Sequence, residues 1–238
     1  MLDWSPEQIY GWLERTYPDD KSLRVSHETI YKSLFIQTRG IFRKESRIHL
    51  RTKRKFRHAK PHSPAGRGHI VDGVSMSERP SETEDRTVLG HWEGDLILGS
   101  NNSQIATLVE RKTRHTVLIK VKTKKTSDVV LALSRQMKKL PALLQQSLTW
   151  DRETEMASHE NLSIATNIDV YFCDPQSPWQ RGTNENTNGL LRQYFPKRSS
   201  RSGFSQKDLN KVAHKLNTRP RKTLDFQTPT DMLNQLLQ

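Results

Sequence analysis

The sequence predicts an α/β fold in which a mixed five-stranded sheet is flanked by helices and preceded by a small helical segment and a basic linker. The strongest signal is a hairpin pattern across residues 104–121, where two aliphatic and β-branched runs flank a charged turn. Short strand-like runs at 91–98, 148–150 and 168–173 alternate further on with helical patterns. An antiparallel start followed by alternating helices and strands is typical of a mixed sheet.

Residues 1–40 predict two capped helices. Ser5 and Gln8 fit a capping box at the start of the first, and Ser26 is a suitable N-cap for the second. A helix pair of this kind resembles a helix-turn-helix DNA-binding segment, with Tyr31 and Lys32 as candidate DNA contacts. A helix pair used for packing or dimerisation remains the alternative.

Residues 41–72 are predicted to form a basic arm and flexible linker. Residues 41–70 hold ten Lys or Arg against a single acid, Glu45. Such a run favours salt-sensitive and largely sequence-independent contact with phosphates, although a solvated charged segment is the simpler alternative. The predicted DNA contacts in the arm are Arg51, Lys53, Arg54, Lys55 and Arg57.

Residues 73–238 are predicted to form one catalytic domain. Its expected strands are 91–98, 104–111, 114–121, 148–150 and 168–173, and its expected helices include 127–140, 209–216 and 231–237. The helix at 127–140 rests on the helical spacing of Val130, Leu133 and Met137.

A further helix is expected to begin at Ser177, which would cap it ahead of a first-turn proline. Five residues recur at helical spacing and are expected to face the core: Thr183, Thr187, Leu190, Leu191 and Tyr194. A second face carries the polar stripe Arg181, Glu185, Asn188 and Arg192. The lone carboxylate on this stripe indicates either a catalytic role or a solvated face with local ion pairs.

Two more carboxylates favour the catalytic interpretation. Asp95 lies on a predicted strand, and Asp151 ends another. Together with Glu185 they would form an oxygen-ligand set suited to Mg²⁺ or Mn²⁺. Two such ions about 3.5–4 Å apart can activate a nucleophile and stabilise the leaving oxygen in phosphoryl transfer. Glu93 shares a strand face with Asp95 and is either a supporting acid or a solvated neighbour.

Four segments carry a resemblance to a known family: GHWEGDL, TWDRETEMA, YFCDPQSPWQRGTNENTNGLLRQYFPK and LNTRPRKTL. They resemble the catalytic domain of bacterial insertion-sequence transposases of the "IS thirty" family, DDE recombinases with an RNase H-like integrase core. The resemblance implies that Asp95, Asp151 and Glu185 are catalytic residues that bind Mg²⁺, with Mn²⁺ as a substitute and two ions at the site. It also implies attack on a phosphodiester by water or a DNA 3′-hydroxyl without a covalent enzyme–DNA intermediate.

The resemblance implies DNA as the partner, both as element ends and as target, and at least a dimer on the DNA. The residues expected to hold the scissile strand are Arg181, Asn184, Asn188 and Arg192. Relatives carry a glycine where this chain has Glu153, and the added carboxylate two residues from Asp151 is expected to impair transposition. The chain also begins inside the longer N-terminal region of its relatives, which indicates either a truncated copy or an internal start.

Composition agrees with a nucleic-acid partner. The net charge of +13 and the pI near 10 favour a polyanion. A single cysteine excludes an intramolecular disulfide and suits a reducing cytoplasm. No apolar run approaches the ~20 residues of a membrane helix, so no membrane partner is expected. The predicted location is the cytoplasm, in association with the nucleoid.

Two other functions remain open at this point. A catalytically impaired remnant would bind element ends or inhibit an intact relative. A plain RNase H-type nuclease would instead digest RNA–DNA hybrids.

Overall fold

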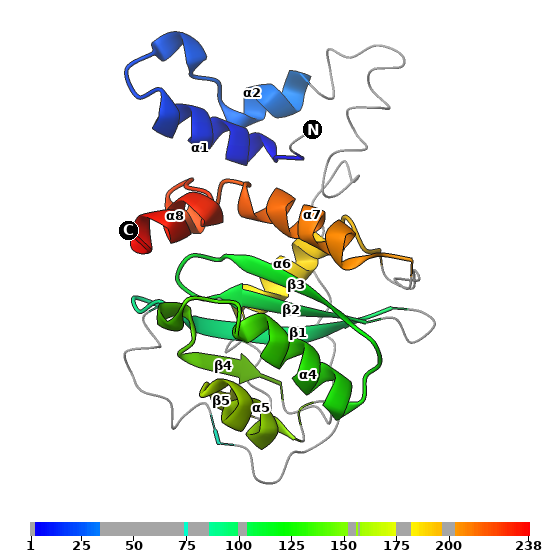
Figure 1. Cartoon of the computed structure of the whole chain (residues 1–238). Coiled ribbons are helices and arrows are strands. Elements are labelled where there is room, and N and C mark those ends of the chain that lie inside the picture. Colours follow the sequence, from blue (N-terminus) through cyan, green and yellow to red (C-terminus); the bar gives the residue numbers. More distant parts are fainter. Residues whose placement is uncertain are drawn as a thin grey trace. The chain divides into compact units, whose positions relative to one another are not determined.

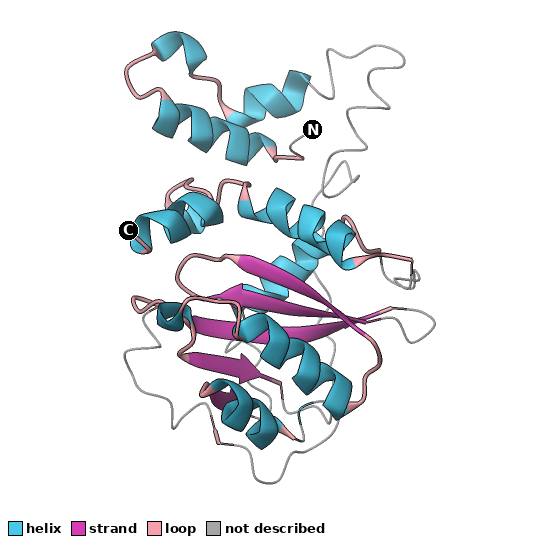
Figure 2. Cartoon of the chain, viewed as in Figure 1, coloured by secondary structure: helices cyan, strands magenta, loops and turns pink. Residues whose placement is uncertain are grey.

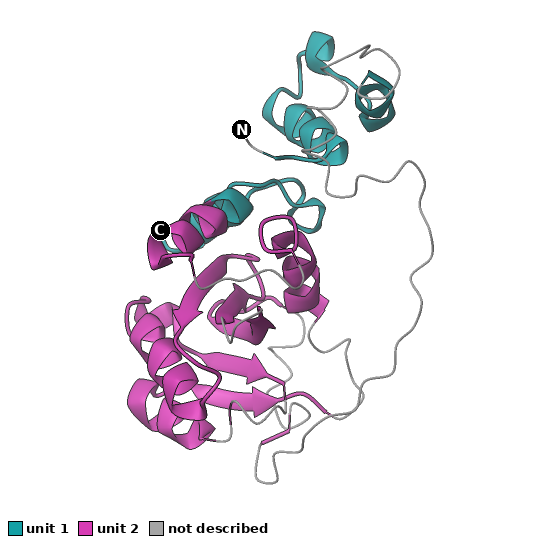
Figure 3. Ribbon diagram, turned by 90° about the vertical axis from the view of Figure 1, so that its right-hand side faces the viewer, with its two compact units in different colours: residues 1–63, 215–238 teal, residues 64–214 magenta. Residues whose placement is uncertain are grey.

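The computed structural model describes residues 3–33, 74–75, 86–99, 104–151, 156, 158–174, 182–196 and 203–238. The chain divides into two compact units (Figure 3). One comprises Met1–Ser63 and Lys215–Gln238, and the other comprises Pro64–His214. The predicted basic arm, including Arg51, Lys53, Arg54, Lys55 and Arg57, lies outside the described residues.

The second unit is built on a five-stranded sheet (Figures 1 and 2). Its strands are β1 (His91–Leu98), β2 (Gln104–Glu110), β3 (Thr116–Val121), β4 (Ser147–Trp150) and β5 (Asp169–Phe172), arranged in the order β3-β2-β1-β4-β5. β1, β2 and β3 pair antiparallel, while β4 is parallel to β1 and β5 is parallel to β4. The predicted mixed five-stranded sheet is therefore confirmed.

Helices α4 (Thr126–Met137) and α5 (His159–Thr166) cover one face of the sheet, and α6 (Gly182–Leu191) packs on the other (Figure 1). The short helix η5 (Ala142–Leu144) precedes β4. Because side chains alternate along a strand, β1 presents Trp92 and Gly94 to one face and Glu93 and Asp95 to the other.

The core lies mainly between the sheet and the α4–α5 face. The buried Trp92 side chain donates its indole N–H to the Leu144 carbonyl at 2.7 Å, which joins β1 to η5. Trp150 and Phe172 are also fully or almost fully buried. Every residue of β2 is buried, as expected of an interior strand whose two faces are both covered.

The first unit contains α1 (Pro6–Thr16), η1 (Lys21–Leu23), α2 (His27–Lys32), η8 (Lys222–Leu224) and α8 (Pro229–Leu236). The predicted Ser5–Gln8 capping box is present at the start of α1. Ser26 caps α2 by accepting the Thr29 backbone N–H. None of the helices in the described ranges combines the length and apolar character needed to cross a membrane.

The C-terminal segment groups with these N-terminal helices. Gln8 donates to the Pro220 carbonyl at 2.9 Å, and Lys222 and Arg15 pair with Glu7 and Asp225 respectively. Residues 215–238, which the sequence analysis included in the predicted domain of 73–238, therefore belong to the same compact unit as the N-terminal helices. Helix α7 (Gln206–Asn217) runs across the division at Lys215.

A close approach between β1 and β4 makes Gly94 sensitive to substitution. A Cβ at Gly94 would lie 2.2 Å from ring atoms of the buried Trp150 side chain and 3.2 Å from the Leu148 side chain. We expect Gly94→Ala to lower the free energy of unfolding by about 1–3 kcal/mol through overpacking, measured by urea denaturation.

Gly182→Ala is the matched control, because a Cβ at Gly182 would meet no atom within 4 Å among the described residues. It should leave the stability unchanged or slightly higher. Equal urea midpoints for Gly94→Ala and the unmodified chain would contradict the expected clash.

Candidate functional site

Two of the three predicted acids belong to β1 and to the end of its parallel partner β4. His91 aligns with Ser147 and Glu93 with Thr149. Asp151 follows Ser147 by the same number of residues as Asp95 follows His91, so the register, continued past the end of β4, sets Asp151 beside Asp95. Neighbouring strands lie about 4.8 Å apart, and paired residues share a face. Both acids are half-buried.

Asp95 is tied directly to α6. One of its carboxylate oxygens accepts a hydrogen bond from the Asn188 side-chain amide at 2.7 Å, and the other accepts the Leu96 backbone N–H at 2.8 Å. Asn188 is three residues after Glu185, so the two lie on one face of α6. The third predicted acid is therefore carried by the helix that contacts Asp95.

The two faces of α6 agree with the sequence interpretation. Thr183, Thr187, Leu190 and Leu191 are buried, and Tyr194 is half-buried. On the other face Glu185 is exposed, while Asn188 and Arg192 are half-buried. The predicted cap at Ser177 and the stripe residue Arg181 lie outside the described residues.

All three acids are among the described residues, and within that part of the chain no group of three or more His, Cys, Asp or Glu is placed to hold a metal ion. Asp95 lies on β1, Asp151 directly follows the paired strand β4, and Glu185 is exposed on the neighbouring helix. The metal-binding triad thus stays a prediction.

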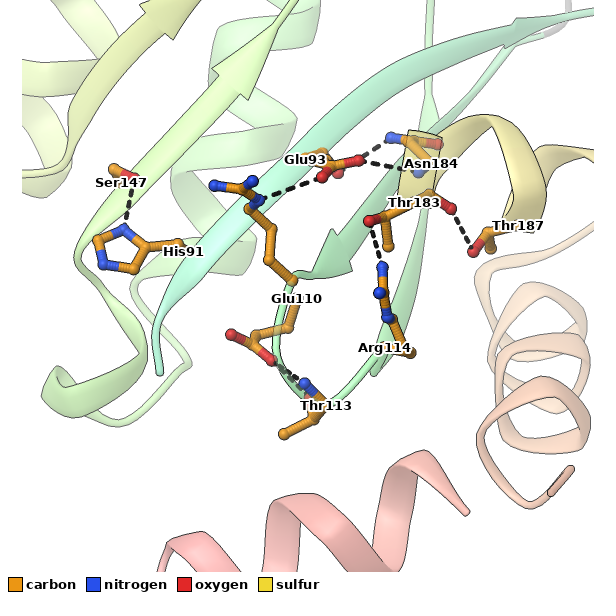
Figure 4. Close-up of polar contacts among 10 residues, drawn as sticks. His91, Glu93, Glu110, Thr113, Arg114, Ser147, Thr183, Asn184 and Thr187 are labelled. Atoms are coloured by element: carbon orange, nitrogen blue, oxygen red, sulfur yellow. Dashed lines mark hydrogen bonds and ion pairs between the residues drawn. The ribbon is translucent and has the colours of Figure 1, made fainter. Parts of the chain in front are cut away.

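Sequence reasoning missed a buried polar network at the start of α6 (Figure 4). Glu93 is fully buried, and its carboxylate accepts the Asn184 backbone N–H at 2.9 Å. The Asn184 side chain donates to the Glu93 carbonyl at 2.9 Å and accepts from the Thr107 hydroxyl at 3.1 Å. Arg111 pairs with the same Glu93 carboxylate at 3.2 Å.

This network changes the assignment of Asn184. The sequence placed Asn184 among the DNA contacts, but its side chain is only 1% exposed and bonds to β1 and β2. The structure gives it a packing role in place of a DNA contact. In the sequence, the alternation of side chains along a strand indicated that Glu93 shares a face with Asp95. That shared face was the one sequence feature that pointed to this network.

The turn between β2 and β3 also reaches α6. The Arg114 guanidinium donates to the Thr183 hydroxyl in the first turn of the helix. Burial lowers the pKa of Arg114 to about 10, and the neighbouring positive charge of Arg86 adds to this effect. Arg114 still carries its proton at neutral pH.

The remaining predicted DNA contacts occur in both units. In the first unit Tyr31 is 41% exposed and Lys32 is exposed, both on α2. In the second unit Arg192 follows α6 and is half-buried. These positions leave DNA contact as a prediction for all three.

This chain is similar in sequence to known proteins over most of its length. Residues 85–178 match the family described as integrase core domain, a range that includes Asp95 and Asp151 and ends before α6. The chain is 50% identical over 235 residues to the transposase InsI for insertion sequence element IS30A of Escherichia coli (strain K12), covering 98% of this chain and 61% of that protein. It is 46% identical to the transposase for insertion sequence element IS1086 of Cupriavidus metallidurans, covering 98% of this chain and 69% of the relative.

The chain belongs to the IS30 family of insertion-sequence transposases. It spans 61% of the length of the InsI relative. Among solved structures, the catalytic core domain of BIV integrase matches with a TM-score of 0.45 and 17% identity, over 60% of this chain and 92% of that one. The five-stranded mixed sheet is the RNase H-like integrase-core fold expected of this IS30-family chain.

His115, which follows Arg114 in the chain, supplies a pH-dependent contribution to stability. Burial lowers the pKa of His115 from its ordinary value of 6.5 to about 4. The unfolded chain therefore binds an extra proton between these two values, and stability falls as the pH falls through that window. Between pH 7 and pH 4 we expect a loss of about 3 kcal/mol from this group.

Urea denaturation of the full chain and of His115→Gln at both pH values measures this contribution. The variant should lose about 3 kcal/mol less than the unmodified chain over the same interval. An identical loss in the two proteins would show that His115 does not titrate as expected.

Proposed function

We propose that this chain is a metal-dependent transposase that cleaves DNA strands and joins them during movement of an insertion sequence. The observation that supports it most is the placement of Asp95. Asp95 lies on β1, which pairs with the strand that Asp151 directly follows, and its carboxylate bonds to the helix that carries Glu185. In an IS30-family chain this arrangement favours a site that acts on phosphodiesters.

The residues present suit Mg²⁺ or Mn²⁺. Integrase-core enzymes of this fold generally use divalent metals. The candidate donors Asp95, Asp151 and Glu185 supply hard carboxylate oxygens, and the buried amide oxygen of Asn188 beside Asp95 has no hydrogen-bond partner among the described residues. When bound, a pair of such ions would activate the attacking hydroxyl and stabilise the leaving oxygen.

The chain's own side chains would position the DNA. Arg192 lies seven residues after Glu185, about two helical turns along the same side, where its charge can neutralise a phosphate. Arg181 and Asn188 would complete this contact on the scissile strand. Their contribution is orientation and charge neutralisation rather than proton transfer.

Binding away from the site would come from the basic arm and from Tyr31 and Lys32. The arm residues Arg51, Lys53, Arg54, Lys55 and Arg57 would release counterions on contact with phosphates, so affinity should fall with salt. Joining an element to its target requires two ends to be held together. We therefore propose at least a dimer on DNA, located in the cytoplasm with the nucleoid.

Glu153 lies outside the described residues, and its expected impairment of transposition stays a prediction.

The acids are tested by conservative substitution. Asp95→Asn, Asp151→Asn and Glu185→Gln should each lower Mn²⁺-dependent cleavage of a duplex carrying the element's own end by about a hundredfold or more, because each removes a metal ligand. The assay counts nicked and joined products on a labelled duplex.

Asp169→Asn is the matched control, since Asp169 is an exposed acid at the start of β5. It should cleave at the unmodified rate. Tight, salt-sensitive binding without cleavage by the unmodified chain would identify a DNA-binding remnant instead. Digestion of RNA–DNA hybrids in preference to duplex DNA would identify an RNase H-type nuclease.

A further inference from the structure

We propose that Glu93 is a positioning residue: its buried carboxylate fixes the first turn of α6 on β1 and so sets where Glu185 stands relative to Asp95. This inference rests on the proposed function for its catalytic meaning. The helix placement itself follows from contacts in the structure.

The contacts between Glu93 and α6 are reciprocal. The Glu93 carboxylate accepts the Asn184 backbone N–H, and the Glu93 carbonyl accepts the Asn184 side-chain amide, both at 2.9 Å. The Thr107 hydroxyl on β2 donates to the remaining Asn184 oxygen at 3.1 Å. Two strands thus hold a single helical residue, and that residue directly precedes Glu185.

The charge of Glu93 is matched on both sides. Arg111, in the turn after β2, pairs with the carboxylate at 3.2 Å, and the two side chains are 5% and 0% exposed. The first turn of a helix carries partial positive charge on its free N–H groups, so a carboxylate there is favoured. Removing the charge of either Glu93 or Arg111 would leave the other charge buried without a partner.

The first turn of α6 depends on such polar contacts because its apolar contacts lie elsewhere. The buried aliphatic residues of α6, Leu190 and Leu191, stand in its last turn, whereas the buried residues of its first turn are Thr183 and Asn184. Apolar burial is non-directional, but hydrogen bonds to a buried carboxylate define one position. The end of α6 that carries Glu185 is therefore placed by Glu93.

Glu110 on β2 provides a matched control. Glu110 is also fully buried. In the pairing of β1 with β2 it lies opposite Trp92, the residue before Glu93. Its carboxylate accepts the Thr113 backbone N–H and hydroxyl at 2.6 Å (Figure 4). It also accepts the Gly90 backbone N–H at 3.2 Å. Neither partner is on α6.

The experiment compares amide hydrogen exchange in the full chain, Glu93→Gln and Glu110→Gln, without metal or DNA. Amides of α6 should exchange about tenfold faster or more in Glu93→Gln, because the first turn opens more often. In Glu110→Gln they should stay within about twofold of the unmodified chain, while the turn at Thr113 loosens. Unchanged α6 exchange in Glu93→Gln, or equal loosening of α6 in both variants, would overturn the proposal.

If Glu93→Gln fails to fold, the double variant Glu93→Met, Arg111→Met tests the positioning role instead. Removing both buried charges should restore a urea midpoint near that of the unmodified chain. The α6 amides should still exchange about tenfold faster, since the carboxylate that accepts the Asn184 backbone N–H is gone. Normal α6 protection in a stable double variant would overturn the positioning role.

A second readout links the helix to the reaction. In Glu93→Gln, the Mn²⁺ concentration for half-maximal cleavage should rise about tenfold while DNA affinity is unchanged, and Glu110→Gln should change neither. Altered α6 exchange with normal Mn²⁺ dependence would overturn the link to Glu185. Should the unmodified chain itself cleave no DNA, the proposed function fails, and the exchange measurements alone then decide whether Glu93 places α6.

Discussion

The alternation of side chains along β1 governs both faces of the sheet. Trp92 and Gly94 are on one face, where Trp92 bonds to η5. The Trp150 side chain lies so close to Gly94 that position 94 has no room for a side chain. Glu93 and Asp95 face the other way and meet α6 through Asn184 and Asn188. A shift of one residue in the pairing of β1 would exchange these two sets, turning the candidate catalytic carboxylate towards the α4–α5 face and the core tryptophan towards α6.

Polar contacts hold the first turn of α6, the helix that faces Asp95, and they affect its placement more than its stability. A buried ion pair such as Glu93–Arg111 adds little net stability, because desolvation offsets most of the attraction between the charges. What it supplies is one defined position for the start of α6. Apolar packing by Leu190 and Leu191 anchors the opposite end of the helix, so stability and placement come from different turns.

Local sequence patterns could predict the strands, the two faces of α6 and the shared face of Glu93 and Asp95, because each follows from side-chain periodicity. They could not predict that Asn184 is buried, since its partners lie 91 and 77 residues away along the chain. The grouping of residues 215–238 with α1 was equally hidden, because it rests on contacts such as Gln8 with the Pro220 carbonyl, which leave no local signature. The family resemblance supplied the fold name and the three acids, and convergence of those acids on a metal stays a prediction.

The central claim is that Asp95, Asp151 and Glu185 bind one metal centre. Fe²⁺ can replace Mg²⁺ or Mn²⁺ at oxygen ligands, and with ascorbate and peroxide it cuts the backbone close to where it is bound. Mass spectrometry of the Fe²⁺-treated chain with DNA should find cuts near all three acids, and Asp95→Asn should abolish the three together. Cuts confined to one of the three segments, or cuts that persist in Asp95→Asn, would contradict the account.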